Sequence, residues 1–276
     1  MEHKINVQSD DLEWLFVPDI VYKEYDDCKR HMHLFVPYRQ KWEDDTVFPV
    51  IIFIPGSAWH RQEMYNAVPS YAKLAERGYV TAIIQHRESE IAKFPAQVED
   101  IVNAVDFLRK KQNEQPWRNL RMDMSRLFLM GNSSGGHIAL MTALMSANNM
   151  TESLKISGVI AESAPTDMFM CGKNHSGTHT KALLGVDDIP DGLDAAKKAG
   201  CDMYIAPNIP LPPMLLMHGT ADSEVDIEHS RRLYKKLTDA GKNVQLYEIE
   251  GAGHGGSVFW SSEILDIIEK FIGSCQ

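Results

Sequence analysis

The stretch LFLMGNSSGGHIAL, residues 127–140, constrains the fold more than any other part of the sequence. An apolar run typical of a buried strand stops at a cluster of glycine and serine, and an apolar helical pattern begins directly after that cluster. Residues 131–135 read Gly-Asn-Ser-Ser-Gly, which matches the G-x-S-x-G pattern in the strand–turn–helix setting where this pattern is informative. The sequence therefore predicts a sharp, strained turn that holds the hydroxyl of Ser133 above the edge of a sheet.

Six short apolar runs, each bounded by glycine, proline or polar residues, predict strands that are buried on both faces. They occupy residues 48–56, 78–87, 125–131, 156–165, 213–219 and 243–251. Helical patterns lie between them; the clearest begins at Pro95, and another closes the chain from Ile264. This alternation predicts parallel pairing, and a period-two pattern over residues 19–37 adds an antiparallel hairpin. The expected fold is an α/β three-layer sandwich with a mostly parallel sheet.

Residues 165–212 interrupt this alternation. The segment combines several prolines with a Lys/Asp-rich middle and predicts short helices without a core strand. Ligands of open α/β sheets bind beyond the carboxyl ends of the strands, so an insertion at this point is placed to cover that crevice. We expect a single domain over residues 1–276 with a small cap at about 165–212. The alternative is that residues 165–212 form a surface insertion without a function.

Composition narrows the classes of partner. The formal net charge is −10 and basic clusters are lacking, which argues against a nucleic-acid partner. The sequence has no run of about eighteen apolar residues, as a membrane-spanning helix needs. Its charged N-terminus, MEHKINVQSDDLEW, is unlike a secretion signal. We therefore expect no membrane partner and a cytoplasmic location, provided that no signal peptide was removed.

The four cysteines show no spacing typical of zinc or redox sites, so we expect free thiols and no metal. They are Cys28, Cys171, Cys201 and Cys275.

Two further loops carry the partners that a reactive serine needs. A serine hydroxyl is a poor nucleophile unless a base removes its proton and a carboxylate orients that base. Asp222 follows the strand at 213–219, and His254 lies in the GAGHGG loop after the last strand. The chain order Ser133, Asp222, His254 is the order found in hydrolases with this arrangement of strands. These three residues are the predicted catalytic triad.

Other residues of the same types are weaker candidates. The remaining histidines considered as the base do not follow the last strand; they are His137, His175, His179 and His218. Glu224 and Asp226 compete with Asp222, although Asp226 is better placed to cap the helix that follows it. Ser134 lacks the flanking glycines of its neighbour. A glycine-rich phosphate-binding turn is the other interpretation of residues 131–135, but it lacks the P-loop lysine.

Hydrolysis of an acyl group also requires donors aimed at the developing oxyanion. The backbone N–H of Ser134 is one candidate, and the loop IPGSAWH after the strand at 48–56 supplies Ser57 and Ala58. Residues that we expect to form apolar or sugar-stacking walls of the pocket are Trp59, Met168 and Trp260. For Trp260, a place in the core of the last helix is an equal alternative.

Several segments together resemble a known family. IPGSAW, HRESEIAKFPAQVEDIVNAVDFLR, GNSSGGHIAL, LLMHGTADSEVD and GAGHGG are similar to segments of α/β-hydrolase esterases related to bifunctional feruloyl/acetyl-xylan esterases. A more distant similarity is to hormone-sensitive-lipase-like carboxylesterases. The resemblance runs from about residue 45 to the C-terminus. It implies the α/β-hydrolase fold, the same triad, and an oxyanion hole formed by N–H groups of Ser57, Ala58 and Ser134.

The resemblance is incomplete at the loop after the first parallel strand. Pro55 replaces the usual histidine, and Ser57 and Ala58 replace glycines, which leaves open which of these two N–H groups donates. Arg87 and Asp100 match positions expected to be structural, as an ion pair supporting the turn at Ser133.

The sequence thus predicts a serine carboxylic-ester hydrolase that acts through an acyl-enzyme without a cofactor. The expected substrate is a small-molecule or oligosaccharide ester from which acetyl, and by extension feruloyl, groups are removed. The alternatives are an arylformamidase-like amide hydrolase, a prolyl-oligopeptidase-like peptidase, although the chain has no room for the usual propeller, and a non-catalytic hydrolase-fold binding protein. The oligomeric state is not predicted; a homodimer remains open.

Overall fold

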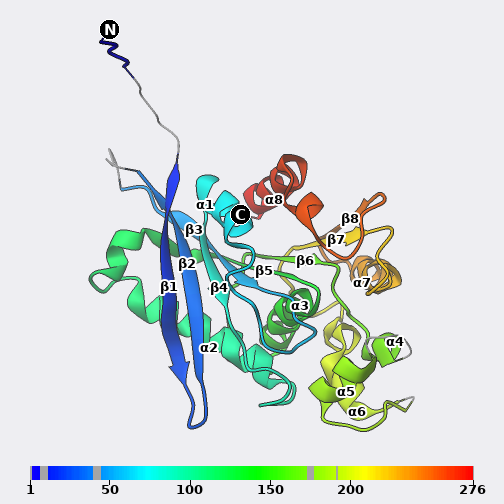
Figure 1. The fold of residues 1–276 in the computed structure, drawn as a ribbon. Helices are drawn as coiled ribbons and strands as arrows, with labels where there is room; N and C mark the ends of the chain where they lie inside the picture. Colours follow the sequence, from blue (N-terminus) through cyan, green and yellow to red (C-terminus); the bar gives the residue numbers. More distant parts are fainter. Residues whose placement is uncertain (1, 7–11, 40–44, 173–176, 191, 276) are drawn as a thin grey trace.

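The computed structural model describes residues 2–6, 12–39, 45–172, 177–190 and 192–275. Its centre is an eight-stranded sheet with the order β1-β2-β4-β3-β5-β6-β7-β8 (Figure 1). The strands are β1 (Glu13–Glu24), β2 (Lys29–Tyr38), β3 (Phe48–Ile54), β4 (Val80–Ile84), β5 (Met122–Asn132), β6 (Gly158–Glu162), β7 (Met214–Gly219) and β8 (Val244–Ile249). β2 pairs antiparallel with both β1 and β4, and all other pairs are parallel. The predicted mostly parallel sheet with an N-terminal hairpin is confirmed.

Helices cover both faces of the sheet. They are α1 (Val68–Glu76), α2 (Ala96–Lys111), α3 (Ser134–Ala147), α4 (Met168–Gly172), α5 (Gly177–Leu184), α6 (Asp194–Ala199), α7 (Glu228–Asp239) and α8 (Ser262–Ser274). Side chains of α2, α3 and α7 share one hydrophobic core with the sheet, and those of α1 and α8 share a second core. The molecule is therefore the three-layer sandwich that the alternating pattern predicts.

The central strands are apolar on both faces because each face meets a layer of helices. Every residue of β3, β4, β6 and β7 is buried. Along β3, Ile52 points into the core with α2 and α3, whereas Phe53 points into the core with α1 and α8. Such strands appear in the sequence as continuous apolar runs, which is why their positions were predictable.

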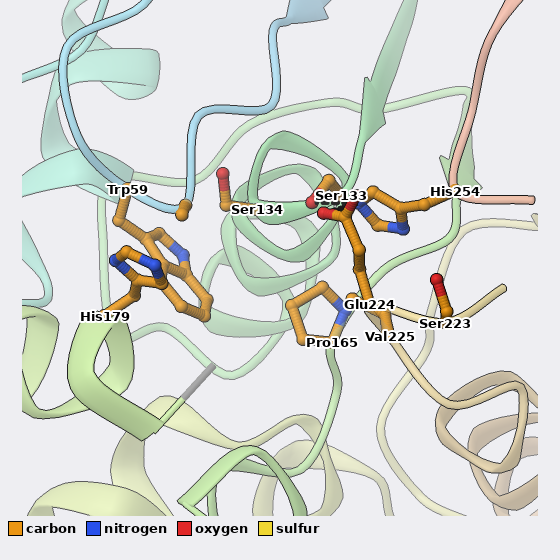
Figure 2. A pocket seen from close by; sticks show the side chains of 10 residues that line it. Trp59, Ser133, Ser134, Pro165, His179, Ser223, Glu224, Val225 and His254 are labelled. Atoms are coloured by element: carbon orange, nitrogen blue, oxygen red, sulfur yellow. Dashed lines mark hydrogen bonds and ion pairs between the residues drawn. The ribbon is translucent and has the colours of Figure 1, made fainter. Parts of the chain in front are cut away.

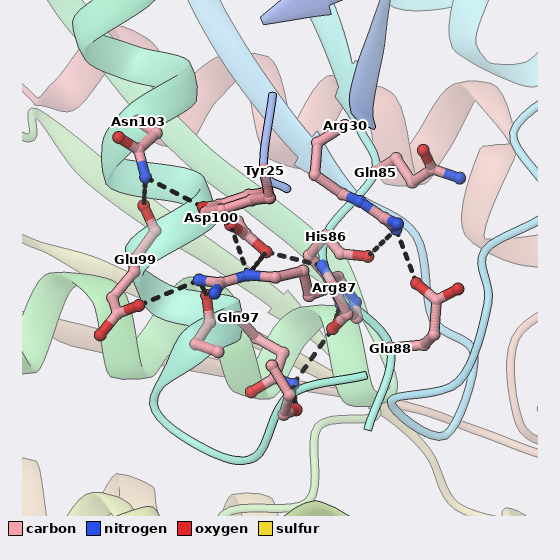
Figure 3. A network of polar contacts seen from close by, with 12 residues as sticks. Tyr25, Arg30, Gln85, His86, Arg87, Glu88, Gln97, Glu99, Asp100 and Asn103 are labelled. Carbon is pink, nitrogen blue, oxygen red and sulfur yellow. Dashed lines mark hydrogen bonds and ion pairs between the residues drawn. The ribbon is translucent and has the colours of Figure 1, made fainter. Parts of the chain in front are cut away.

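The predicted ion pair between Arg87 and Asp100 forms (Figure 3). Arg87 Nε lies 3.0 Å from the buried Asp100 carboxylate, and the backbone N–H of Arg87 donates to the same carboxylate at 2.6 Å. The hydroxyl of Tyr25, which follows β1, also donates to Asp100, and the Arg87 guanidinium lies 4.2 Å from the centre of the Tyr25 ring. These contacts tie the N-terminal hairpin to α2 and to the loop after β4. None of these contacts involves residues 131–135, so support of the turn at Ser133 stays a prediction.

Between β6 and β7 the described chain forms α4, α5, α6 and a 3₁₀ turn at 201–204. Figure 1 shows α4, α5 and α6 gathered at one end of the sheet. Backbone contacts attach this segment to the rest of the molecule: Phe94 N–H donates to Leu183 O at 3.0 Å. Residues 173–176 and 191 of the expected cap lie outside the described ranges. Among the described helices, none is both long and apolar enough to cross a membrane.

Candidate active site

The turn at Ser133 joins β5 to α3 in a conformation that few side chains tolerate. Ser133 has φ 53° and ψ −129°, and a positive φ is costly for any residue except glycine. The flanking glycines allow the turn because a Cβ on Gly131 would lie 2.5 Å from the backbone of Gly135. A Cβ on Gly135 would in turn lie 1.9 Å from Ile54 O. Close backbone packing against β3 therefore holds Ser133 in its strained conformation.

The structure brings Ser133, His254 and Asp222 into one chain of hydrogen bonds. His254 Nε2 lies 2.9 Å from Ser133 Oγ, and His254 Nδ1 lies 2.8 Å from Asp222 Oδ2. The three residues follow β5, β8 and β7, whose carboxyl ends lie at the same edge of the sheet. An ionised carboxylate can only accept, so Nδ1 carries the proton and Nε2 offers its lone pair to the hydroxyl of Ser133. This is the geometry that general-base activation of a serine requires.

Asp222 is surrounded by donors. Its Oδ1 accepts from the backbone N–H groups of Glu224 at 2.9 Å and Val225 at 3.0 Å. Its Oδ2 lies 3.2 Å from Nε2 of the buried His218. Burial alone would raise the pKa of Asp222, but the hydrogen bonds from His218, His254 and Val225 hold that pKa well below its usual range. The carboxylate is therefore ionised at neutral pH.

The pKa of the His254 imidazole is shifted in the opposite direction, upward. Burial lowers the pKa of His254, but the hydrogen bond and the charge of Asp222, with a further contribution from Glu224, raise that pKa above its ordinary value. His254 is thereby a stronger base than a free imidazole.

Two hydrogen bonds fasten the loop after β3 to the turn at Ser133. Gly56 N–H donates to Asn132 Oδ1 at 3.0 Å, and Ser57 N–H donates to Ser134 Oγ at 2.9 Å. The N–H of Ser57 is thus already occupied. Ser57 is also not among the residues that line the pocket, so its N–H is not placed as the expected oxyanion donor.

The next residue in the loop, Ala58, does line the pocket. Ala58 has φ 51° and lines the pocket together with Ser133 and Ser134. Ser134 is the first residue of α3, where N–H groups have no intrahelical acceptor. Among the described residues, neither Ala58 N–H nor Ser134 N–H donates a hydrogen bond. Both N–H groups belong to residues that line the pocket together with Ser133.

The triad opens into a pocket of about 380 Å³ (Figure 2). Its lining consists of Ala58, Trp59, Ser133, Ser134, Pro165, His179, Ser223, Glu224, Val225 and His254. Pro165 and His179 come from the segment between β6 and β7, so this insertion supplies part of the wall. The volume falls within the range of small-molecule sites, about 300–1,000 Å³.

The three predicted wall residues have different positions. Trp59 lines the pocket but is only 2% exposed, and its Nε1–H donates to His137 Nδ1 at 3.0 Å. Met168 is absent from the lining because the first turn of α4 directs its side chain fully into the core. Trp260 packs on the rings of Phe53 and Tyr71 on the α1/α8 side of the sheet. For Trp260 the core alternative was therefore the better one.

The other histidines and carboxylates considered as the base or the orienting acid have different contacts. His137 is fully buried, which lowers its pKa to about 4, and its Nε2 donates to Ala199 O at 2.8 Å. Asp226 Oδ1 accepts from Glu228 N–H at 2.9 Å at the start of α7, as a capping residue does. His218 supports Asp222 from within β7, and His175 lies outside the described residues. Across the described ranges, no cluster of three His, Cys, Asp or Glu side chains is arranged to hold a metal ion.

Sequence reasoning did not predict three side-chain roles in the site. The side chains of Asn132 and Ser134 hold the loop after β3, and His179 enters the pocket from α5. Asn132 and Ser134 are the variable positions of the G-x-S-x-G pattern, so the pattern itself carries no signal for them. His179 was considered only as a base, because its approach depends on how the insertion folds back.

The strand order, the turn at Ser133 and the Ser–Asp–His order together define an α/β-hydrolase. Residues 34–237 match the family model BD-FAE, and the chain belongs to this family. It is 24% identical over 232 residues to Esterase LipC of Mycobacterium tuberculosis, covering 79% of this chain and 55% of that protein. It is 23% identical to the isoprenylcysteine alpha-carbonyl methylesterase ICME of Arabidopsis thaliana, covering 83% of this chain and 54% of that protein. The chain thus spans about half the length of these curated relatives.

A solved structure shares the fold over nearly the whole chain. A truncated form of a carbohydrate esterase from gut microbiota superposes with a TM-score of 0.80 and 22% sequence identity, covering 96% of this chain and 97% of that one. This similarity confirms the α/β-hydrolase architecture.

Proposed function

We propose that this chain is a serine carboxylesterase with Ser133 as nucleophile, His254 as base and Asp222 as the orienting acid. One observation carries the proposal: the Ser133–His254–Asp222 hydrogen-bond chain, with distances of 2.9 and 2.8 Å, opens into a pocket of about 380 Å³. The strained backbone at Ser133 supports the assignment because such strain concentrates at functional sites. The relatives named above are esterases, which favours ester over amide or peptide hydrolysis.

The first half of the reaction transfers the acyl group to the enzyme. Ser133 Oγ attacks the carbonyl carbon while His254 Nε2 takes the hydroxyl proton, and the carbonyl electron pair moves to oxygen. When the tetrahedral intermediate collapses, the ester C–O bond breaks and the imidazolium gives its proton to the departing alcohol. Asp222 remains ionised throughout and stabilises the imidazolium through Nδ1. The product of this half-reaction is an acyl-enzyme on Ser133.

Water completes the cycle by the same route. His254 takes a proton from the water as its oxygen attacks the acyl carbon, and returns that proton to Ser133 Oγ as the acyl C–O bond breaks. The carboxylic acid leaves and the free enzyme is restored.

The backbone N–H groups of Ala58 and Ser134 are proposed to stabilise the oxyanion in both half-reactions. Donors that are fixed before the reaction need no reorganisation when charge develops. The hydrogen bonds from the N–H groups of Gly56 and Ser57 to the side chains of Asn132 and Ser134 supply this rigidity, since they fix the backbone immediately before Ala58.

For the substrate, we propose a neutral ester with a small acyl group, of which an acetylated carbohydrate is the preferred case and a feruloylated carbohydrate the second. The pocket is small, and Glu224 lies 3.9 Å from His254 Nε2, which disfavours anionic groups near the reacting atoms. The structural match to a carbohydrate esterase supports a sugar ester as the substrate. Esterase LipC and the methylesterase ICME are relatives whose names mention no carbohydrate.

We further propose that residues 1–276 act as one catalytic domain in which residues 165–212 form a cap. Pro165 and His179, both in this segment, line the pocket, which supports a role beyond a surface excursion.

Hydrolysis of 4-nitrophenyl acetate tests the proposal. Ser133→Ala is expected to lower kcat by at least about 10³-fold, because the oxyanion donors and binding alone remain. Ser70→Ala, at a partly exposed serine of α1 far along the chain from the triad, is the matched control and is expected to retain activity within about twofold. Full activity of Ser133→Ala would refute the proposal.

A further inference from the structure

A second polar chain approaches the pocket from the side of the insertion. It consists of Glu90 from the loop after β4, His60 from the loop after β3, and His179 from α5. His60 Nδ1 is hydrogen-bonded to Glu90 Oε1, and His60 Nε2 lies 2.7 Å from His179 Nδ1. The two imidazole rings meet edge to face, with centroids 4.8 Å apart. None of these three residues belongs to the triad.

The order of donors and acceptors along this chain follows from the carboxylate at its end. Glu90 accepts, so His60 Nδ1 carries a proton; with His60 neutral, its Nε2 accepts from His179 Nδ1–H. A neutral His179 then exposes the lone pair of Nε2. Among the described residues, His179 Nε2 has no hydrogen-bond partner. With both imidazoles neutral, Glu90 and His60 thus set the tautomer of His179 and leave its Nε2 as a free acceptor.

The chain is attached firmly to the catalytic loop. The backbone carbonyl of His60 accepts from Ser57 Oγ at 2.7 Å and from Gln62 Nε2. The segment carrying Glu90 is joined to the same loop, since Ser89 N–H donates to Trp59 O at 2.9 Å. His60 is thus held by the residues that place Ala58 beside Ser133.

His179 lines the pocket on the side opposite His254. In Figure 2 the His179 ring lies beside Trp59, across the pocket from His254 and Ser223, with Ser133 and Ser134 between the two sides. This side of the pocket thus presents one hydrogen-bond acceptor, the Nε2 atom of His179, beside the largely buried Trp59. A hydroxyl group of a ligand is a suitable donor to such an acceptor.

We propose that His179 is a substrate-binding residue that accepts a hydrogen bond from a hydroxyl group of the ester substrate, with His60 and Glu90 as positioning residues. The hydroxyl belongs either to the alcohol, as in a partly acetylated sugar, or to the acyl group, as in a hydroxycinnamoyl ester. This inference rests on the proposed esterase function and adds to it a residue that selects hydroxylated substrates.

Matched pairs of substrates test the inference. The first pair is an acetylated methyl xyloside and cyclohexyl acetate, which lacks ring hydroxyls. The second pair is methyl ferulate and methyl 3,4-dimethoxycinnamate, in which the phenol is blocked. His179→Ala is expected to lower kcat/KM for the hydroxylated member of one pair by about tenfold, the factor that one hydrogen bond of about 1.4 kcal/mol supplies. The pair that responds identifies the part of the substrate that carries the hydroxyl.

Three variants separate recognition from a structural role. Thr178→Ala, at an exposed neighbour on α5, is the matched control and is expected to leave both members of each pair within about twofold. For each substrate pair, the measured quantity is kcat/KM for the hydroxylated member divided by kcat/KM for the member without that hydroxyl. Glu90→Gln is expected to lower this ratio, as His179→Ala does, because the tautomer of His179 is no longer set. In the double variant with His179→Ala, the Glu90→Gln change is expected to have no further effect on that ratio.

The outcomes distinguish this inference from the proposed function. Loss of wild-type activity on every ester would refute the esterase itself. An active wild type in which His179→Ala changes both members of each pair equally, or neither, would overturn the role of His179 while leaving the triad intact.

Discussion

Asp222→Asn is the substitution that separates orientation from proton transfer in this site. In the wild type, Asp222 Oδ1 accepts from Glu224 N–H and Val225 N–H, while Oδ2 faces His254 Nδ1 at 2.8 Å. An asparagine that keeps its oxygen on the two backbone donors must turn its NH₂ group toward His254. The imidazole then has to accept at Nδ1, which places a proton on Nε2, the nitrogen that should accept from Ser133.

The size of the effect follows from the hydrogen bond that His254 Nδ1 makes with the carboxylate. A hydrogen bond to a charged carboxylate contributes about 1.5–3 kcal/mol, and replacing it by a mismatched contact or the wrong tautomer costs a similar amount again. The sum of about 3–6 kcal/mol in the transition state corresponds to a fall in kcat of about 10²–10⁴-fold. The pKa of His254 should also fall toward or below its ordinary value, because the charge that raises it is gone.

Steady-state hydrolysis of 4-nitrophenyl acetate from pH 5 to 9 measures both effects. Asp226→Asn is the matched control: the same chemical change, four residues along the chain, at a carboxylate that caps α7. It is expected to retain kcat within about twofold. An Asp222→Asn enzyme within tenfold of wild-type kcat would refute the role given to Asp222.

Further predictions concern the pH profile, the hydrogen bond between Ser57 and Ser134, and the glycine-flanked turn at Ser133. Because protonated His254 cannot accept from the serine and its pKa is raised, kcat/KM should fall on acidification with a midpoint above the ordinary 6.5; a midpoint below 6.5 would contradict the electrostatics. Ser134→Ala removes the acceptor of Ser57 N–H and should lower kcat for aryl acetates by about tenfold with little change in KM, since about 1–2 kcal/mol of loop support is lost. Gly135→Ala would place a Cβ 1.9 Å from Ile54 O, so thermal unfolding should show a Tm lowered by several degrees or no folded protein, and a wild-type Tm would refute the packing.

Much of the fold was predictable because buried strands and buried helix faces appear as apolar patterns in the sequence. The strands that are covered on both faces appear as uninterrupted apolar runs, and α2 appears as an apolar stripe that begins after Pro95. The order of strands in the sheet leaves no such trace, since the position of β4 between β2 and β3 is decided by pairing between distant segments.

The three side chains of the Ser133–His254–Asp222 hydrogen-bond chain were likewise identifiable, because each follows a strand at the same edge of the sheet and chain order distinguishes them from their rivals. The conformation of the loop after β3 was not predictable from the sequence. Whether Ser57 or Ala58 faces the pocket depends on a side-chain acceptor, Ser134 Oγ, on another segment. Met168 was assigned to the pocket wrongly because its position near the cap says nothing about the rotation of α4, which turns it into the core.

Covalent labelling with a fluorophosphonate, followed by intact mass and peptide mapping, tests whether Ser133 is the nucleophile. One phosphonyl group per chain is expected, located on Ser133, with labelling strongly slowed in a His254→Ala variant that remains folded. Labelling at a different residue, or an enzyme that hydrolyses esters while Ser133 stays unmodified, would contradict this role of Ser133.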